Sequence, residues 1–263
     1  MKPHLKEYAY PAILEFIKEQ TKGKKCVVIG LSGGIDSAVV SKLCCDALGP
    51  ERVFNIIMPS SVSSKKDVDD AQNLCTEFGM NYKVIQLDTL INAFSAILDL
   101  HDPLLKGNIM ARVRMTILYH HAHQMDGVVM GTGNKSELLT GYFTKHGDGG
   151  VDLLPIGDLY KTEVRELAEK IQIPQTIITK SPSAGLRAGQ TDEEDLGVKY
   201  DELDQILLGL EQLMSVDEIQ KETGLEISII NSVFDKYQSS THKRKMPLIP
   251  KLGIRTIGCD WRE

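Results

Sequence analysis

One glycine- and serine-rich stretch carries the clearest chemical signal in the sequence. It reads Gly30-Leu31-Ser32-Gly33-Gly34-Ile35-Asp36-Ser37 and lies between an apolar run at 26–29 and a segment with apolar residues at helical spacing. This pattern predicts a strand, a tight turn and a helix N-terminus. Gly33 and Gly34 let a ligand approach the backbone, and the first N–H groups of a helix have no partner within it. The stretch therefore predicts an anion site suited to phosphate.

The acid in this stretch separates it from the common nucleotide-binding loops. The stretch lacks the Lys-Ser/Thr ending of a Walker A loop and the third glycine of a dinucleotide-binding fingerprint. Asp36 instead stands where phosphates are expected, and a carboxylate beside phosphate requires a divalent cation between the two. We therefore expect Mg²⁺ near Asp36.

Alternating strand and helix patterns must position this loop. Further strand patterns lie at 52–59, 83–88 and 127–132, and helical patterns lie at 3–21, 63–78, 90–100, 107–124 and 158–171. The alternation predicts an α/β fold, a parallel doubly wound sheet flanked by helices, with extra C-terminal helices within 201–237. Ligands of such sheets bind beyond the carboxyl ends of the strands, where 30–37 and 132–137 should emerge. The stretch 177–195 has little periodicity and predicts a mobile loop.

Length and composition set the broad class of the protein. The 263 residues, 29.2 kDa and 42% hydrophobic content predict one large domain, 1–263. The formal charge of −6 argues against a nucleic-acid-coating protein, and no stretch approaches the ~18 apolar residues of a membrane span. The start is no signal peptide, and the five cysteines include no C-x-x-C pair. We expect a cytoplasmic protein with no nucleic-acid or membrane partner.

Several blocks of sequence together resemble one enzyme family. The blocks are GLSGGIDS at 30–37, GNIMARVRM at 107–115, GTGNKSE at 131–137, GYFTKHGDGG at 141–150, DLLPIGDLYKTEV at 152–164 and THKRK at 241–245. The first resembles the SGGxDS loop of the ATP pyrophosphatases, and the set resembles the ammonia-dependent NAD synthetases. This resemblance implies an adenine nucleotide alpha hydrolase-like fold. It also implies a ligase that makes NAD from deamido-NAD, ATP and ammonia through an adenylated substrate, releasing AMP and pyrophosphate.

The resemblance also implies roles for individual residues. The implied catalytic residues are Asp36, Glu137 and Lys161, of which Asp36 and Glu137 would hold Mg²⁺. The residues implied to contact ATP, the co-substrate, come from both strand-end loops and later segments: Gly30, Leu31, Ser32, Gly33, Gly34, Ile35, Asp36, Ser37, Thr132, Lys161 and Ser183. Ser183 departs from the family's more usual threonine but keeps the hydroxyl. Deamido-NAD is implied to contact Arg112, Lys145, Asp152, His242 and Lys243 near the interface of a homodimer.

Structural roles are open alternatives for several of these residues. Glu137 could be a helix-start acid favoured by the helix dipole, and Lys161 a solvated lysine at a helix start. The basic run 242–245 could be a solvated tail. Arg114 lies two residues after Arg112 on a different helical face, so we expect it to form a structural ion pair.

Other functions are also open at this stage. Another SGGxDS ATP pyrophosphatase, either a different amide synthetase or a tRNA thiolase, would share the first block, although the acidic charge and missing C-x-x-C disfavour the thiolase. A non-catalytic nucleotide-sensing module would share the architecture but gives no reason for both Asp36 and Glu137 at the phosphate end. Ammonia is the expected direct donor because the synthetase blocks fill the chain, and a separate glutaminase partner stays open. We expect the order of 180–195 to depend on bound ATP.

Overall fold

A parallel four-stranded sheet forms the centre of the computed structural model, which describes residues 1–183 and 191–256. Its strands are β1 (Cys26–Gly30), β2 (Val53–Ile57), β3 (Asn81–Val84) and β4 (Gly127–Met130), in the spatial order β3-β2-β1-β4. β1 pairs with β2 on one side and with β4 on the other, so Val27 lies opposite both Val53 and Val128. The chain order reverses beside β1, and the crevice at its carboxyl end is where the loop 30–37 begins.

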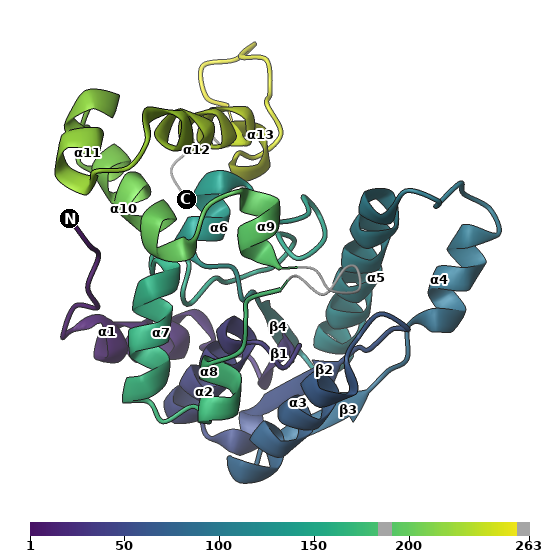
Figure 1. The fold of residues 1–263 in the computed structure, drawn as a ribbon. Coiled ribbons are helices and arrows are strands. Elements are labelled where there is room, and N and C mark those ends of the chain that lie inside the picture. The colour runs from purple at the N-terminus through teal and green to yellow at the C-terminus, as the bar shows by residue number, and fades with distance from the viewer. Residues whose placement is uncertain (184–190, 257–263) are drawn as a thin grey trace.

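Helices cover both faces of the sheet (Figure 1). Val27 and Ile29 of β1 pack in one core cluster with α1 (Ala9–Gln20), α2 (Ile35–Leu48), α3 (Lys65–Glu77) and α7 (Lys161–Lys170). Val28 packs in a second cluster with α4 (Asp88–Ser95) and α5 (Pro103–Gln124) on the opposite face. Successive side chains of a strand point to opposite faces, which is why β1 is apolar throughout. The predicted doubly wound α/β fold is confirmed.

The C-terminal helices form a third apolar cluster at one end of the molecule (Figure 1). α10 (Tyr200–Glu211), α11 (Val216–Thr223) and α12 (Ile227–Ser239) contribute to it, and they pack on Tyr160 at the start of α7. The remaining elements are short: η1 (Pro50–Arg52), α6 (Lys135–Thr140), α8 (Gln175–Ile178), α9 (Asp192–Leu196) and α13 (Thr241–Arg244). Within 1–183 and 191–256, none of the helices combines the length and apolarity that crossing a membrane requires.

Several predicted boundaries are wrong for local reasons. α5 begins at Pro103 rather than 107, because the Asp102 carboxylate caps it by accepting the Leu104 N–H at 2.7 Å and proline suits a first helical position. β3 ends at Val84 rather than 88, and all of its side chains are exposed, as befits an edge strand. α4 spans Asp88–Ser95 rather than 90–100, and α1 begins at Ala9 rather than 3.

The predicted mobile loop at 177–195 is wrong at both ends. α8 reaches Ile178, and α9 begins at Asp192, where the Thr191 hydroxyl accepts the Glu194 N–H at 3.4 Å. The Asp192 N–H donates to the Pro182 carbonyl at 3.0 Å, which brings the two ends of this segment together. The rest of that prediction, including the ATP-dependent order, falls on 184–190, outside the described residues.

Candidate active site

The loop 30–37 joins β1 to α2, and its polar groups form hydrogen bonds with one another. Gly34 is the N-cap of α2 and donates its N–H to Ser32 Oγ at 3.2 Å. The Ser37 hydroxyl accepts the Ser32 N–H at 3.2 Å and donates to the Gly34 carbonyl at 3.0 Å. The two serine hydroxyls lie 3.0 Å apart. These are the donors that a phosphate at the helix N-terminus would take over.

Gly33 fixes the turn of this loop. Its φ is +80°, in the region that favours glycine. A Cβ at this position would lie 2.2 Å from the Asp67 carbonyl oxygen on α3, so the turn is pressed against that helix. Any side chain at 33 would therefore move the loop away from α3.

Three charged side chains from distant parts of the chain meet at the start of α2. The Lys161 ammonium, at the start of α7, is hydrogen-bonded to Asp36 Oδ2 and lies 3.9 Å from Glu137 Oε1. Lys161 is 1% exposed, so its interpretation as a solvated lysine is wrong. The structure thus brings together the three residues predicted to be catalytic.

The surroundings of these groups favour positive charge between the carboxylates. Burial, and then the nearby Asp36 carboxylate, raise the pKa of Glu137 well above its usual range. Burial opposes charge on Lys161, but Asp36 and Glu137 outweigh it and hold the pKa of Lys161 above its ordinary value. Two converging carboxylates are a donor set that fits Mg²⁺, which takes one or two protein carboxylates and completes its octahedron with phosphate and water.

Asn134 belongs to this site and was missed from the sequence. Its side-chain N–H donates to Asp36 Oδ1 at 3.0 Å, and the residue is fully buried. Asn134 also caps α6: its Oδ1 accepts the Glu137 N–H at 3.0 Å, and Glu137 Oε2 accepts the Asn134 N–H at 3.1 Å. Glu137 is therefore a helix-start acid as well as a candidate metal ligand. The Asn-x-x-Glu capping pattern was the signal that could have identified Asn134.

Tyr200 and Asp192, which lie beside Lys161, were also not predicted from the sequence. The Tyr200 ring lies 5.2 Å from the Lys161 ammonium and is fully buried. The Tyr200 hydroxyl donates to Asp192 Oδ2 at 3.3 Å, and Asp192 Oδ1 has no hydrogen-bond partner among the described residues. No local pattern marks either residue, because both reach the site through the packing of the C-terminal helices.

Three of the five residues predicted to bind deamido-NAD form a connected group. Arg112 on α5 donates to the Lys145 carbonyl at 3.4 Å, and the Lys145 ammonium donates to the His242 carbonyl at 2.9 Å. The side chains of Arg112 and His242 are exposed. Asp152 lies apart: its carboxylate accepts the Val129 N–H at 2.8 Å and the Tyr119 hydroxyl at 2.9 Å, at the edge of β4.

The fifth residue, Lys243, is directed into the protein. Its ammonium donates to the Gly141 and Phe143 carbonyls, both at 2.7 Å. The neighbouring Arg244 guanidinium donates to the Leu138 and Leu139 carbonyls at the end of α6, at 3.1 and 2.8 Å. The interpretation of 242–245 as a solvated tail is therefore wrong for these two cations.

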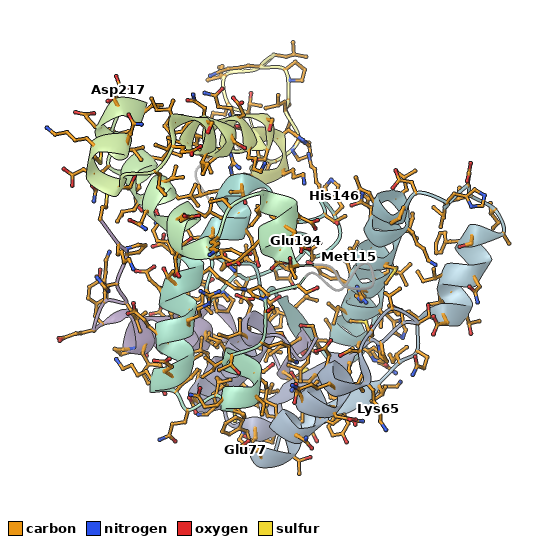
Figure 2. The ribbon with its side chains drawn as sticks, in the orientation of Figure 1. Lys65, Glu77, Met115, His146, Glu194 and Asp217 are labelled. Atoms are coloured by element: carbon orange, nitrogen blue, oxygen red, sulfur yellow. The ribbon has the colours of Figure 1, made fainter. Side chains whose placement is uncertain are left out.

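The remaining predicted residues are placed less directly. Arg114 donates to the Met58 carbonyl at 3.4 Å, and the predicted ion pair is not found among the described residues. Thr132 is half-buried in the loop after β4, and exposed Ser183 follows Pro182, which contacts Asp192. Figure 2 labels Met115 of α5 and His146 of the loop 141–150; a Cβ at Gly150 would lie 3.2 Å from Met115 Cγ, so this loop packs on α5.

Comparison with known proteins places the chain among related enzymes. The sequence model of the family described as NAD synthase matches residues 9–247. The NH(3)-dependent NAD(+) synthetase of Methanosarcina mazei is 47% identical over 252 residues, which are 94% of this chain and 98% of that protein. The solved NMN synthetase of Francisella tularensis has a TM-score of 0.83 at 33% identity, covering 93% of this chain and 98% of its own. The NH3-dependent NAD synthetase of Campylobacter jejuni has a TM-score of 0.79 at 35% identity, covering 93% and 99%.

Proposed function

This chain belongs to the NAD synthase family, and from that membership we infer that it is a ligase that amidates deamido-NAD with ammonia, using ATP, to form NAD. The observation that carries the assignment of the site is the meeting of Asp36, Glu137 and Lys161 at the N-terminus of α2. That group of charges lies beside the loop whose backbone and hydroxyl donors suit a polyphosphate.

The reaction needs an activated carboxylate, because oxide is too poor a leaving group for ammonia to displace. The nicotinate carboxylate attacks the α-phosphorus of ATP, pyrophosphate leaves, and ammonia then displaces AMP from the mixed anhydride. Both reactants of the first step are anions, so fixed positive charge must bring them together. Lys161 supplies such charge, and the donors of loop 30–37 hold the departing pyrophosphate.

Mg²⁺ is the cofactor that we propose for this site. Asp36 and Glu137 would hold it, and it would neutralise phosphate charge during adenylation. Burial and the half-buried Asp36 carboxylate raise the pKa of Glu137, so its anion is disfavoured in the free site and a cation bound between the two carboxylates would stabilise it.

We place deamido-NAD against Arg112, Lys145 and His242. The guanidinium of Arg112 is exposed on α5 and offers a fork of donors to phosphate or carboxylate. Lys243 contributes to this site indirectly: its hydrogen bonds hold the backbone of the loop 141–143, which positions Lys145 two residues later. Asp152 is proposed to contact the substrate from the edge of β4.

A homodimer is proposed from the surface formed by β3, α4 and the start of α5. Eight large apolar side chains are exposed on these elements, of which α4 and α5 lie next to each other at one side of the molecule (Figure 1): Tyr82, Val84, Leu90, Phe94, Ile97, Leu98, Leu104 and Leu105. A second copy is the proposed occupant, because the relatives' family is expected to form homodimers and the same helix, α5, carries Arg112. The Ile97 side chain is 82% exposed. Analytical ultracentrifugation of Ile97→Lys should therefore show a monomer if this surface is the interface.

The mononucleotide analogue of deamido-NAD is the second candidate substrate. The solved relative with a TM-score of 0.83 is an NMN synthetase, whose product is a mononucleotide. The Methanosarcina mazei relative, at 47% identity, is instead an NAD(+) synthetase, which favours the dinucleotide. The four free cysteines of the described residues support a reducing compartment, and the cytoplasm is the proposed location.

A direct assay tests the function. The protein is supplied with ATP, Mg²⁺, ammonium and either deamido-NAD or nicotinate mononucleotide, and the products are separated by chromatography. We expect NAD, AMP and pyrophosphate from the dinucleotide, at a higher kcat/KM than the mononucleotide. Release of ADP would contradict adenylation, and a higher kcat/KM with the mononucleotide would change the substrate. A parallel reaction with glutamine in place of ammonium should form no NAD.

A further inference from the structure

Lys180 makes contacts that the proposed reaction does not use. Its ammonium donates to the Gly33 carbonyl at 3.0 Å, to Asp67 Oδ1 at 2.7 Å and to Asp70 Oδ2 at 2.7 Å. An ammonium has three N–H donors, so all of them are occupied. Lys180, which follows α8, thus links the loop 30–37 to α3, and it lies more than one hundred residues from both in the sequence.

These contacts keep Lys180 charged and in place. Its side chain is 22% exposed, and the Asp70 side chain is 11% exposed. Burial opposes charge on Lys180, but hydrogen bonds and attraction from Asp67 and Asp70 hold its pKa above the ordinary value. Hydrogen bonds between charged partners are the stronger kind, so the two carboxylates anchor the ammonium against Gly33.

The bond to Gly33 sets the direction of the next N–H group. The described chain has no cis peptide bond, so the Gly33 carbonyl and the Gly34 N–H point in opposite directions within the plane of their peptide. Lys180 holds the carbonyl on the α3 side. The Gly34 N–H therefore faces the Ser32 and Ser37 hydroxyls, on the side where pyrophosphate is proposed to bind.

We propose that Lys180 is a positioning residue for pyrophosphate, which holds the Gly33–Gly34 peptide in its anion-binding orientation through the Gly33 carbonyl. The inference rests on the proposed function, because it concerns the loop that would receive the departing pyrophosphate. Without Lys180, Gly33 can rotate, since glycine occupies positive and negative φ with similar ease. The Gly34 N–H then spends less time directed at the anion.

The test measures binding of inorganic pyrophosphate with Mg²⁺ by titration calorimetry. Lys180→Met should weaken this binding about tenfold, which corresponds to roughly 1.4 kcal/mol, and should raise the KM for ATP by a similar factor. Affinity for deamido-NAD should stay unchanged. Lys42→Met is the matched control, because Lys42 is a half-buried lysine paired with Asp46 that does not contact the loop. Pyrophosphate binding within twofold of wild type for Lys180→Met overturns the proposal.

A triple variant separates positioning from simple charge compensation. In Lys180→Met/Asp67→Asn/Asp70→Asn no uncompensated carboxylate is left beside the loop, but Gly33 still lacks its donor. The proposal predicts that pyrophosphate binding stays weak in this variant. Recovery to wild-type affinity would overturn it, because Lys180 would then act only by neutralising Asp67 and Asp70.

Two further measurements protect the test. Lys180→Leu has an apolar side chain with no donor and serves as the second variant if Lys180→Met does not fold; it should also bind pyrophosphate weakly, and wild-type affinity would overturn the proposal. Binding is measured without turnover. Failure of the proposed reaction would therefore appear as absent NAD synthesis by the wild type, and failure of this inference as unchanged pyrophosphate affinity.

Discussion

Two lysines, Lys161 and Lys243, are withdrawn from water in contrasting surroundings. Lys161 contacts the carboxylates of Asp36 and Glu137, whereas Lys243 donates its hydrogen bonds to the carbonyls of Gly141 and Phe143 and lies 5.4 Å from the Phe143 ring. Burial disfavours charge on both. At Lys161 the carboxylates outweigh burial and the pKa rises, but at Lys243 burial prevails over the attraction of Asp148 and the pKa falls below its ordinary value.

The contrast separates a site that handles charge from one that holds the chain together. Formal charges that converge in a buried place repel one another when their counter-ion is removed, so such a group is maintained for what it binds. Backbone carbonyls around an ammonium need no ionised partner. Lys243 thereby joins α13 to the loop 141–143. We assign it a structural role, in which it holds the loop beside the proposed substrate site, whereas Lys161 acts through its charge.

The largest effect is expected from the carboxylates around Lys161. Asp36→Asn and Glu137→Gln should each lower turnover by at least about a hundredfold, because electrostatic groups at a reacting centre contribute on that scale. NAD formation at saturating Mg²⁺ and ATP measures the loss, and thermal unfolding checks the fold. The control is Asp158→Asn, an acid whose side chain is 96% exposed. Near-normal turnover of either variant would remove that carboxylate from the site.

Stability should also distinguish the two lysines. Lys161→Met leaves two carboxylates, each with a side chain 17% exposed, without their cation and should cost about 3–5 kcal/mol of unfolding free energy. Lys243→Met removes the ammonium that donates to the Gly141 and Phe143 carbonyls and should lower the free energy of unfolding by about 1–2 kcal/mol. Urea unfolding measures both. In Lys161→Met/Glu137→Gln part of the loss should return because one unpaired charge is gone. Equal losses for the two single variants would break the comparison.

The sequence predicted the parts of this molecule that depend on neighbouring residues. The strand, turn and helix around Gly33 follow from β-branched, glycine and apolar spacing, and the alternation of strands and helices predicted the confirmed fold. The helix predicted at 63–78 is also confirmed: α3 begins after Ser64, whose Oγ accepts the Asp67 N–H at 3.0 Å. The functional roles of the site residues stay predictions.

What the sequence could not predict depends on distant contacts. Lys161 lies at a helix start, where lysine is ordinarily solvated, and its partner Asp36 is 125 residues away. Tyr200 and Asp192 reach the same place only because the C-terminal helices pack on α7. The sequence predicted a third strand at 83–88 but not that β3 is an exposed edge of the sheet, because the order of the strands depends on distant pairing.

Asn134→Asp should sharpen the comparison by adding charge without changing size. Aspartate caps a helix as well as asparagine does, so α6 should keep its start, but a new carboxylate buried beside Asp36 should lower stability by about 1–3 kcal/mol. The new carboxylate cannot donate to Asp36 and repels it, and turnover should fall at least about tenfold. Steady-state kinetics and urea unfolding measure the two effects. Loss of stability with retained turnover would assign Asn134 to capping alone.

The smallest effect is a pH dependence that Lys243 should contribute to stability. Its pKa in the folded protein is lower than the ordinary 10.5, so in the window between the two values the native state binds fewer protons than the unfolded chain. Stability from this residue therefore increases as the pH rises through that window. The difference in unfolding free energy between wild type and Lys243→Met should be larger at about pH 10 than at about pH 8, and should not change for Lys245→Met, the exposed lysine of the same run. A difference that shrinks as the pH rises would mean that Asp148 outweighs burial, and Lys243 would then be held by formal charge as Lys161 is.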